Sequence, residues 1–282
     1  MNFENVSEIV KKIIEQEFPL NREEALRIAL SCIDLTTLEG SDNEQKIQSL
    51  CNQAKEFSSL AQNLSNCAAV CVYPVFVRQA KSILKGSGVK VACVAGAFPS
   101  GQSPLDIRLK EIEFAVNEGA DEVDIVISRG KLLEKKYDEV KFEISKAKEL
   151  CKNITLKVIL ETGELQNLEN IAIASQLAID AGADFIKTST GKIGVSATYE
   201  SVYVMCEVIK EYFIKTGIRI KLKPAGGISD NDTAINYLKI ANHVLGKDWL
   251  NNNMFRFGAS RLATKIVEEL SGKVSANNAS AY

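Results

Sequence analysis

The residue with the clearest chemical potential is Lys187, which ends a short apolar run and is followed by hydroxyl residues, a glycine and a second lysine. An amine at the end of a buried strand loses its proton near neutral pH when burial and nearby cations disfavour the ammonium form. A neutral amine attacks a carbonyl carbon and forms a Schiff base. The structural alternative is a strand-end lysine whose ammonium group reaches solvent.

Three more ionisable residues, Asp124, Lys157 and Lys223, interrupt apolar runs elsewhere in the chain. Polar groups in buried strands cost free energy unless they are paired. One carboxylate and three amines, counting Lys187, are therefore expected to form an interior network. Each also has an outward-facing alternative: Asp124 as a helix cap, Lys157 on a solvated face, and Lys223 in a basic stripe with Lys221.

Short apolar runs that alternate with amphipathic stretches must position these residues. Residues 107–118 and 168–180 carry apolar side chains at helical spacing between such runs. Eight strand–helix units predict an α/β protein with a (β/α)8 TIM barrel. A doubly wound open sheet is the alternative, but the first run lacks the glycine fingerprint expected there. The candidate strands are 31–35, 68–72, 90–96, 122–127, 155–161, 183–188, 218–223 and 254–258.

A single barrel domain is expected over residues 1–270. Residues 1–27 are predicted to form an extra N-terminal helix that caps one end of the barrel, and the small polar residues 271–282 a flexible C-terminal tail. In a barrel, side chains at the carboxyl ends of the strands converge on one mouth. That mouth is where the four ionisable residues would meet.

The composition of the 282-residue chain narrows the function classes. A net charge of -2 gives no general attraction to nucleic acid or to an anionic membrane, and no apolar run approaches the roughly 20 residues that span a bilayer. Seven cysteines without a CxxC pair are typical of a reducing cytoplasm. The only histidine, His243, argues against a histidine-built metal site, so no metal or cofactor is expected.

Two glycine-containing segments follow the last two candidate strands. Gly226 and Gly227 come soon after Lys223, and Gly258 and Ser260 come just before another helix start. Glycines let a phosphate approach the backbone, and barrels often bind phosphate at these two loops. Each segment alone is also compatible with an ordinary turn. Together they predict a phosphate site and a phosphorylated small-molecule partner.

Seven motifs occur in order along the chain: Asp-Leu-Thr-Thr-Leu from 34, Val-Cys-Val-Tyr-Pro from 70, Asp-Glu-Val-Asp from 121, Leu-Lys-Val-Ile-Leu-Glu-Thr-Gly-Glu from 156, Asp-Phe-Ile-Lys-Thr-Ser-Thr-Gly-Lys from 184, Lys-Pro-Ala-Gly-Gly from 223 and Arg-Phe-Gly-Ala-Ser from 256. In these motifs the chain closely resembles the 2-deoxyribose-5-phosphate aldolases, which are class I aldolases. The resemblance implies a lyase of deoxyribonucleotide catabolism. Its reaction would be the reversible cleavage of 2-deoxy-D-ribose 5-phosphate to acetaldehyde and D-glyceraldehyde 3-phosphate through a lysine Schiff base.

The resemblance also implies catalytic roles. Lys187 corresponds to the Schiff-base nucleophile, and Lys223 to the ammonium that lowers its pKa. Asp124 corresponds to the proton donor and acceptor, with Lys157 as its partner. Tyr282 matches a C-terminal tyrosine that assists proton transfer in some members, although an inert tail is the alternative.

The remaining site residues follow from the same resemblance. The substrate-binding residues would be Asp34, Cys71, Thr188 and Thr190, and the phosphate-binding residues Lys192, Gly226, Gly227, Gly258 and Ser260. Arg261 stands where the family often has a second serine, and Ser229 where it often has an arginine. A shift of the basic group from one phosphate loop to the other would explain both departures.

Two other functions fit part of the pattern. A transaldolase-like Schiff-base aldolase would act on a larger ketose phosphate. A non-catalytic sugar-phosphate-binding barrel would keep the phosphate loops, but it has no need of Lys187, Lys223 and Asp124 together. The sequence does not define the oligomeric state, and a homodimer is left open as one assembly.

Overall fold

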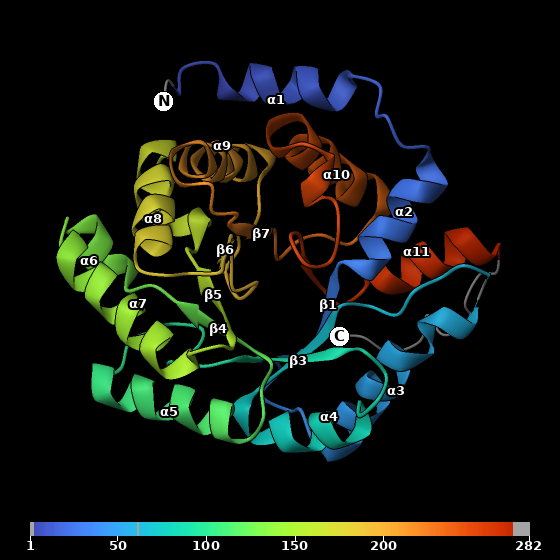
Figure 1. The fold of residues 1–282 in the computed structure, drawn as a ribbon, viewed down its shortest axis with the longest axis horizontal. Helices are drawn as coiled ribbons and strands as arrows, with labels where there is room; N and C mark the ends of the chain where they lie inside the picture. Colours follow the sequence, from blue (N-terminus) through green and yellow to red (C-terminus); the bar gives the residue numbers. More distant parts are fainter. Residues whose placement is uncertain (1–2, 61, 273–282) are drawn as a thin grey trace.

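The computed structural model describes residues 3–60 and 62–272. Eight parallel strands lie inside a ring of helices (Figure 1). Each strand overlaps the apolar run predicted for it, and the TIM-barrel prediction is confirmed. The strands are β1 (Ile33–Thr36), β2 (Ala69–Val72), β3 (Lys90–Val94), β4 (Glu122–Val126), β5 (Thr155–Ile159), β6 (Phe185–Lys187), β7 (Lys221–Lys223) and β8 (Phe257–Ala259).

The strands are hydrogen-bonded in the order β7-β6-β5-β4-β3-β2-β1-β8. Between β7 and β8 the barrel closes through two parallel bridges, which pair Leu222 with Phe255 and Ala225 with Gly258. A Cβ on Gly258 would lie 2.7 Å from the Ala225 Cβ. A glycine is therefore needed where β8 meets the segment after β7 and closes the barrel.

The helices cover the outside of the strands. Local signals set several helix ends: the Asn167 side chain caps the N-terminus of α8, a capping box at Thr198 begins α9, and Gly217 ends α9 with a φ of 72°. Helix α8 spans the predicted residues. The helices are α1 (Val6–Glu15), α2 (Arg22–Ser31), α3 (Glu44–Leu60), α4 (Val77–Ile83), α5 (Leu105–Asn117), α6 (Arg129–Leu133), α7 (Tyr137–Cys151), α8 (Leu168–Asp180), α9 (Tyr199–Thr216), α10 (Asn231–Leu245) and α11 (Leu262–Ser271).

The N-terminal segment differs from the prediction. It forms two helices, and α1 packs against α9 and α10 on the outer side of the helix ring rather than over an end of the strands (Figure 1). The reason is the amphipathic character of α1, which buries Val6, Val10 and Ile13. At the other end of the chain, α11 extends through Ser271, and residues 273–282 of the predicted tail lie outside the described residues.

Apolar side chains fill two regions. The larger one lies between the strands and the helices and extends from Val6 to Ile266. A small one lies inside the barrel on the side of β2 and β3, where Ala69, Cys71 and Ala92 pack together. None of the helices in residues 3–60 and 62–272 combines the length and the apolar character needed to span a bilayer.

Candidate active site

The inner face of the barrel collects seven buried ionisable side chains, which lie on β1, β4, β5, β6 and β7 and just before β8. Successive residues of a strand point to opposite faces, so Glu122 and Asp124 of β4 face the interior together. The seven residues are Asp34, Glu122, Asp124, Lys157, Lys187, Lys223 and Arg256.

Asp124 lies at the centre of this network. Its Oδ2 accepts hydrogen bonds from Lys187 Nζ at 2.7 Å and from Lys223 Nζ at 2.9 Å. Its Oδ1 accepts one from Lys157 Nζ at 2.9 Å. The structure thus brings together all four residues that the sequence placed in an interior network, and it excludes the outward-facing alternatives for them.

Asp34 and Glu122 are the other two carboxylates of the network, and they pair with Lys157, Lys223 and Arg256. Asp34 accepts hydrogen bonds from Lys223 Nζ at 2.5 Å, Lys157 Nζ at 3.1 Å and Arg256 Nη1 at 2.6 Å. Glu122 pairs with Lys157 at 2.5 Å and with Arg256 at 2.8 Å. The proposed substrate contact Asp34 is therefore part of the ionic network.

Glu122 and Arg256 had no assigned role in the sequence analysis. The two-residue period could have found both, because Glu122 precedes Asp124 by two residues and Arg256 precedes Gly258 by two. Interior charges at these positions have to be paired, since an unpaired buried charge is costly. Glu122 and Arg256 satisfy each other and hold the neighbouring Asp34 and Lys157.

The three interior lysines differ in proton affinity. Burial lowers the pKa of Lys187; the Asp124 carboxylate opposes this shift, and the Lys223 ammonium reinforces it. Burial also acts to lower the pKa values of Lys223 and Lys157, but Asp124 and Asp34 outweigh it and raise both. Lys187 is thus the lysine of the three that most readily becomes a neutral amine.

The carboxylates remain ionised. Burial alone would raise their pKa values, but the surrounding cations lower those of Asp34 and Asp124 and bring that of Glu122 to about 2. Without Lys187 the network holds three carboxylates and three basic groups: Lys157, Lys223 and Arg256. A neutral Lys187 therefore leaves the interior of the barrel with balanced charge.

The proposed substrate-binding hydroxyls make hydrogen bonds within the protein. Thr188 Oγ1 donates to the Ala225 carbonyl at 3.1 Å and accepts from the Ala225 N–H at 2.9 Å, which ties the end of β6 to the chain after β7. Thr190 Oγ1 donates to Glu161 at 2.5 Å. Cys71 is buried in the apolar part of the interior, and burial raises the pKa of its thiol.

Ser189, between the two threonines, also had no assigned role. Its hydroxyl oxygen is buried and has no hydrogen-bond partner among the residues that the structure describes. A buried hydroxyl without a partner costs free energy. Because it lies two residues after Lys187, Ser189 is a further candidate for contact with a bound molecule.

Four of the predicted phosphate-binding residues, Lys192, Gly226, Gly227 and Ser260, lie in the loops after β6, β7 and β8, whereas Gly258 lies within β8 and pairs with Ala225. Lys192 Nζ pairs with Glu39 Oε1 at 2.9 Å. Gly226 and Gly227 have positive φ values, 82° and 76°. Ser260 is exposed and precedes α11, whose N-terminus has no side-chain cap. The predicted proton-transfer residue Tyr282 lies outside the described residues.

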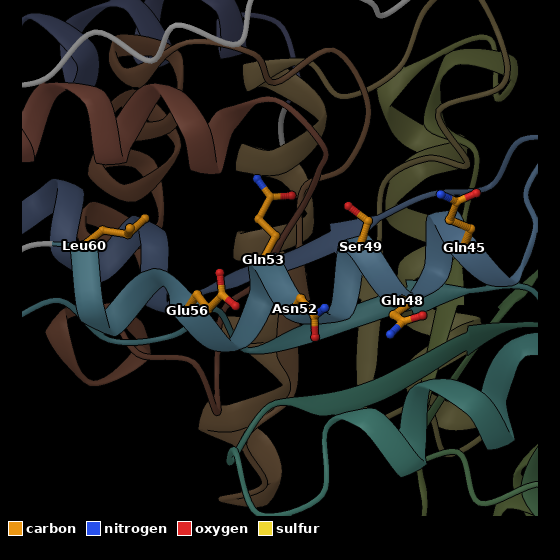
Figure 2. A pocket seen from close by; sticks show the side chains of 7 residues that line it. All are labelled: Gln45, Gln48, Ser49, Asn52, Gln53, Glu56 and Leu60. Atoms are coloured by element: carbon orange, nitrogen blue, oxygen red, sulfur yellow. The ribbon is translucent and has the colours of Figure 1, made fainter.

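A hollow on the outer surface follows helix α3 and has no connection to this network. Figure 2 shows its lining side chains, which all extend from that helix and are mostly amides. Among them Glu56 is the only ionisable one. The hollow therefore lacks the paired charges found inside the barrel, and the candidate active site lies at the carboxyl ends of the strands.

A TIM barrel whose interior holds a buried lysine beside a carboxylate has the groups that an aldolase needs at the carboxyl ends of its strands. The comparisons with known proteins narrow the class to one family. Residues 28–247 match the family described as DeoC/LacD family aldolase, and the chain belongs to this family.

Curated relatives agree with this assignment, and a solved structure has the same fold. The deoxyribose-phosphate aldolase of Homo sapiens is 43% identical over 252 residues, which cover 86% of this chain and 79% of the relative. That of Bos taurus is 42% identical over the same shares. A tetrameric deoxyribose phosphate aldolase from Aeropyrum pernix shares the fold, with a TM-score of 0.69, 24% identity and coverage of 93% of this chain and 97% of that one. The chain is an enzyme of the carbon–carbon lyase class, in the deoxyribose-phosphate aldolase family.

Proposed function

We propose that this enzyme reversibly cleaves 2-deoxy-D-ribose 5-phosphate to acetaldehyde and D-glyceraldehyde 3-phosphate through a Schiff base on Lys187. The observation that supports it most is the position of the Lys187 Nζ, buried 2.7 Å from Asp124 Oδ2 and sharing that oxygen with Lys223. Burial and Lys223 favour its neutral form. A neutral amine in that place is a nucleophile for the aldehyde carbon C1.

The cleavage then follows from the protonated imine. Lys187 adds to C1, and the hydroxyl formed there takes up a proton and leaves as water, so that the nitrogen carries a positive charge and attracts electrons. When the C3 hydroxyl loses its proton, the C2–C3 bond breaks, its electron pair moves toward the nitrogen, and glyceraldehyde 3-phosphate departs. The enamine that remains takes up a proton at C2, and water releases acetaldehyde from Lys187.

Asp124 is the proposed proton acceptor and donor in these steps. Its ion pairs keep it ionised, so that it can accept the C3 hydroxyl proton through a water molecule. Lys157 holds the second oxygen of this carboxylate at 2.9 Å. Lys223 supplies the positive charge that keeps Lys187 neutral, and Tyr282 is retained as a proposed aid to proton transfer.

The phosphate is proposed to bind at the loops after β6, β7 and β8. Lys192 supplies a cation there, and the glycines after β7 expose backbone N–H groups. Helix α11 has an N-terminus without a side-chain cap, whereas Asp230 caps α10. The anion is therefore expected on the α11 side, beside Ser260 and Arg261, rather than at the start of α10.

Borohydride trapping tests the proposal directly. The protein is treated with acetaldehyde and borohydride, and the reduced adduct is mapped by peptide mass. We expect one adduct, on Lys187, and none in Lys187→Met. An adduct on another lysine, or no adduct in the native enzyme, would refute the Schiff-base assignment.

The substrate is tested separately by comparing cleavage of 2-deoxyribose 5-phosphate with cleavage of ketose phosphates. Faster cleavage of a ketose phosphate would favour a transaldolase-like enzyme.

We further propose that residues 1–270 form one domain that works in the cytoplasm as a homodimer. One contiguous core from Val6 to Ile266 supports the single domain, and seven free buried cysteines support the cytoplasmic location. Light scattering in solution tests whether the protein is a homodimer.

A further inference from the structure

Glu161 is a buried carboxylate with no part in the proposed reaction. It follows β5 and is fully buried. Its backbone is left-handed, with a φ of 57° and a ψ of 58°, which is uncommon for glutamate. In this position its Oε1 accepts a hydrogen bond from the Thr190 N–H at 3.1 Å, and its Oε2 accepts one from Thr190 Oγ1 at 2.5 Å.

The same short segment touches a neighbouring loop at two more points. Residues 161–163 are here called the β5 turn, and residues 188–198, between β6 and α9, the β6 loop. The Thr162 N–H donates to the Thr188 carbonyl at 2.9 Å. A Cβ placed on Gly163 would lie 2.1 Å from the Val195 carbonyl oxygen. The β5 turn thus contacts the β6 loop at two positions near its start, Thr188 and Thr190, and at Val195 in its second half.

Thr190 passes this constraint on to Lys192. The Thr190 hydroxyl donates to Glu161 and accepts a hydrogen bond from the Lys192 N–H at 3.1 Å. Glu161 is itself held by Arg129, whose Nη1 lies 3.2 Å from Oε2 and whose Nη2 donates to the Ser100 carbonyl at 3.0 Å. A chain of polar contacts therefore runs from the loop after β3, through α6 and the β5 turn, to Lys192.

We propose that Glu161 is a positioning residue, which with Gly163 fixes the β6 loop so that Lys192 meets the phosphate of the substrate. The proposal rests on the proposed function, because it takes the phosphate site from there. The proposal distinguishes how two lysines near the start of the β6 loop are held. Lys187 is held by Asp124 before the loop begins, whereas Lys192 is held through Thr190 by Glu161.

Variants of Glu161 test this separation. In Glu161→Gln and Glu161→Ala we expect the KM for 2-deoxyribose 5-phosphate to rise, by about tenfold or more in the alanine variant, with a smaller change in kcat. Trapping of Lys187 by acetaldehyde and borohydride should keep its native rate, because acetaldehyde carries no phosphate. Glu164→Ala is the matched control, since Glu164 also pairs with Arg129, at 3.1 Å, but is half exposed.

A second variant disturbs the β6 loop without changing any charge. In Gly163→Ala the new methyl group displaces the Val195 carbonyl, and the KM should rise in the same direction with trapping again unchanged. This variant and Glu161→Gln keep the test decisive even if Glu161→Ala fails to fold.

Two outcomes would overturn the proposal. One is a native KM in folded Glu161→Gln and Gly163→Ala. The other is a loss of Lys187 trapping that parallels the rise in KM, which would make Glu161 a residue of the amine site or of general stability. Failure of the native enzyme to be trapped at all would instead refute the proposed function, and the two failures are therefore distinguishable.

Discussion

Lys187 lies 2.7 Å from a carboxylate, so its neutral form has to be favoured against an available ion pair. Burial and Lys223 supply that preference. An arginine at this position keeps its charge at any accessible pH and cannot add to a carbonyl. Lys187→Arg should therefore have no measurable turnover. The larger side chain should cost about 1–3 kcal/mol of the free energy of unfolding. Activity assays and urea unfolding check both, and residual turnover would contradict the mechanism.

The influence of Lys223 on Lys187 should appear in the pH dependence. Removing the ammonium in Lys223→Met raises the pKa of Lys187, because Lys223 acts to lower it. The neutral amine then forms only at higher pH, and the acid limb of the trapping rate should move to higher pH. Lys221→Met is the control, since the Lys221 ammonium lies over the Phe185 ring at 5.2 Å. If the acid limb of the trapping rate lies at the same pH in Lys223→Met as in the native enzyme, Lys223 does not lower the pKa of Lys187.

Among neighbouring strands of the barrel, β7 and β8 are joined by the fewest residue pairs, and Gly258 lies at their contact. In Gly258→Ala the new Cβ would lie 2.7 Å from the Ala225 Cβ and 3.3 Å from Lys223 Cε. We expect a loss of about 1–3 kcal/mol in the free energy of unfolding, together with reduced activity because Lys223 moves. Denaturant unfolding and steady-state kinetics measure the two effects.

Two companion variants make this test specific. Ala225→Gly in the same chain removes the methyl group that the new Cβ would meet, and it should restore part of both losses. Gly130→Ala is the neutral control, because a Cβ at Gly130 meets nothing within 4 Å and Gly130 lies in α6. If Gly258→Ala behaves like Gly130→Ala, the contact between β7 and β8 has more room than the structure shows.

Buried parallel strands are continuous apolar runs, and for that reason all eight could be found in the sequence. The position of α1 could not be found in the sequence, because an amphipathic pattern shows that one face of a helix is buried but not which helices cover it. Asp124 and the lysines were found because each interrupts an apolar run. Glu161 was noted at the end of its strand but was given no role, since its contacts depend on a left-handed backbone that a glutamate does not signal.

At the scale of the whole molecule, the interior charges link stability to pH. The pKa values of Asp34, Glu122 and Asp124 are lower in the folded chain than in the unfolded one. Their contribution is complete above the unfolded values of about 4 and is lost as the pH falls through the folded values, which is about 2 for Glu122. The free energy of unfolding should therefore be level near neutrality and fall below about pH 5.

One variant separates this network from the rest of the molecule. Glu122→Gln leaves Arg256 with an incomplete partner and should cost about 3–5 kcal/mol near neutral pH, with the difference from the native protein shrinking in acid. Glu8→Gln is the control, because Glu8 forms an exposed pair with Lys12 and its loss should leave the free energy of unfolding nearly unchanged. Equal effects of the two substitutions would contradict the role given to the interior pairs.

The equal numbers of carboxylates and cations around Lys187 have a consequence for protein engineering. A designer who moves only this lysine into another barrel would transfer an amine but not its neutrality, because that depends on six charges from four other strands and the segment before β8. The interior as a whole is the transferable unit, and a graft should carry Asp34, Glu122, Asp124, Lys157, Lys223 and Arg256 together with the lysine.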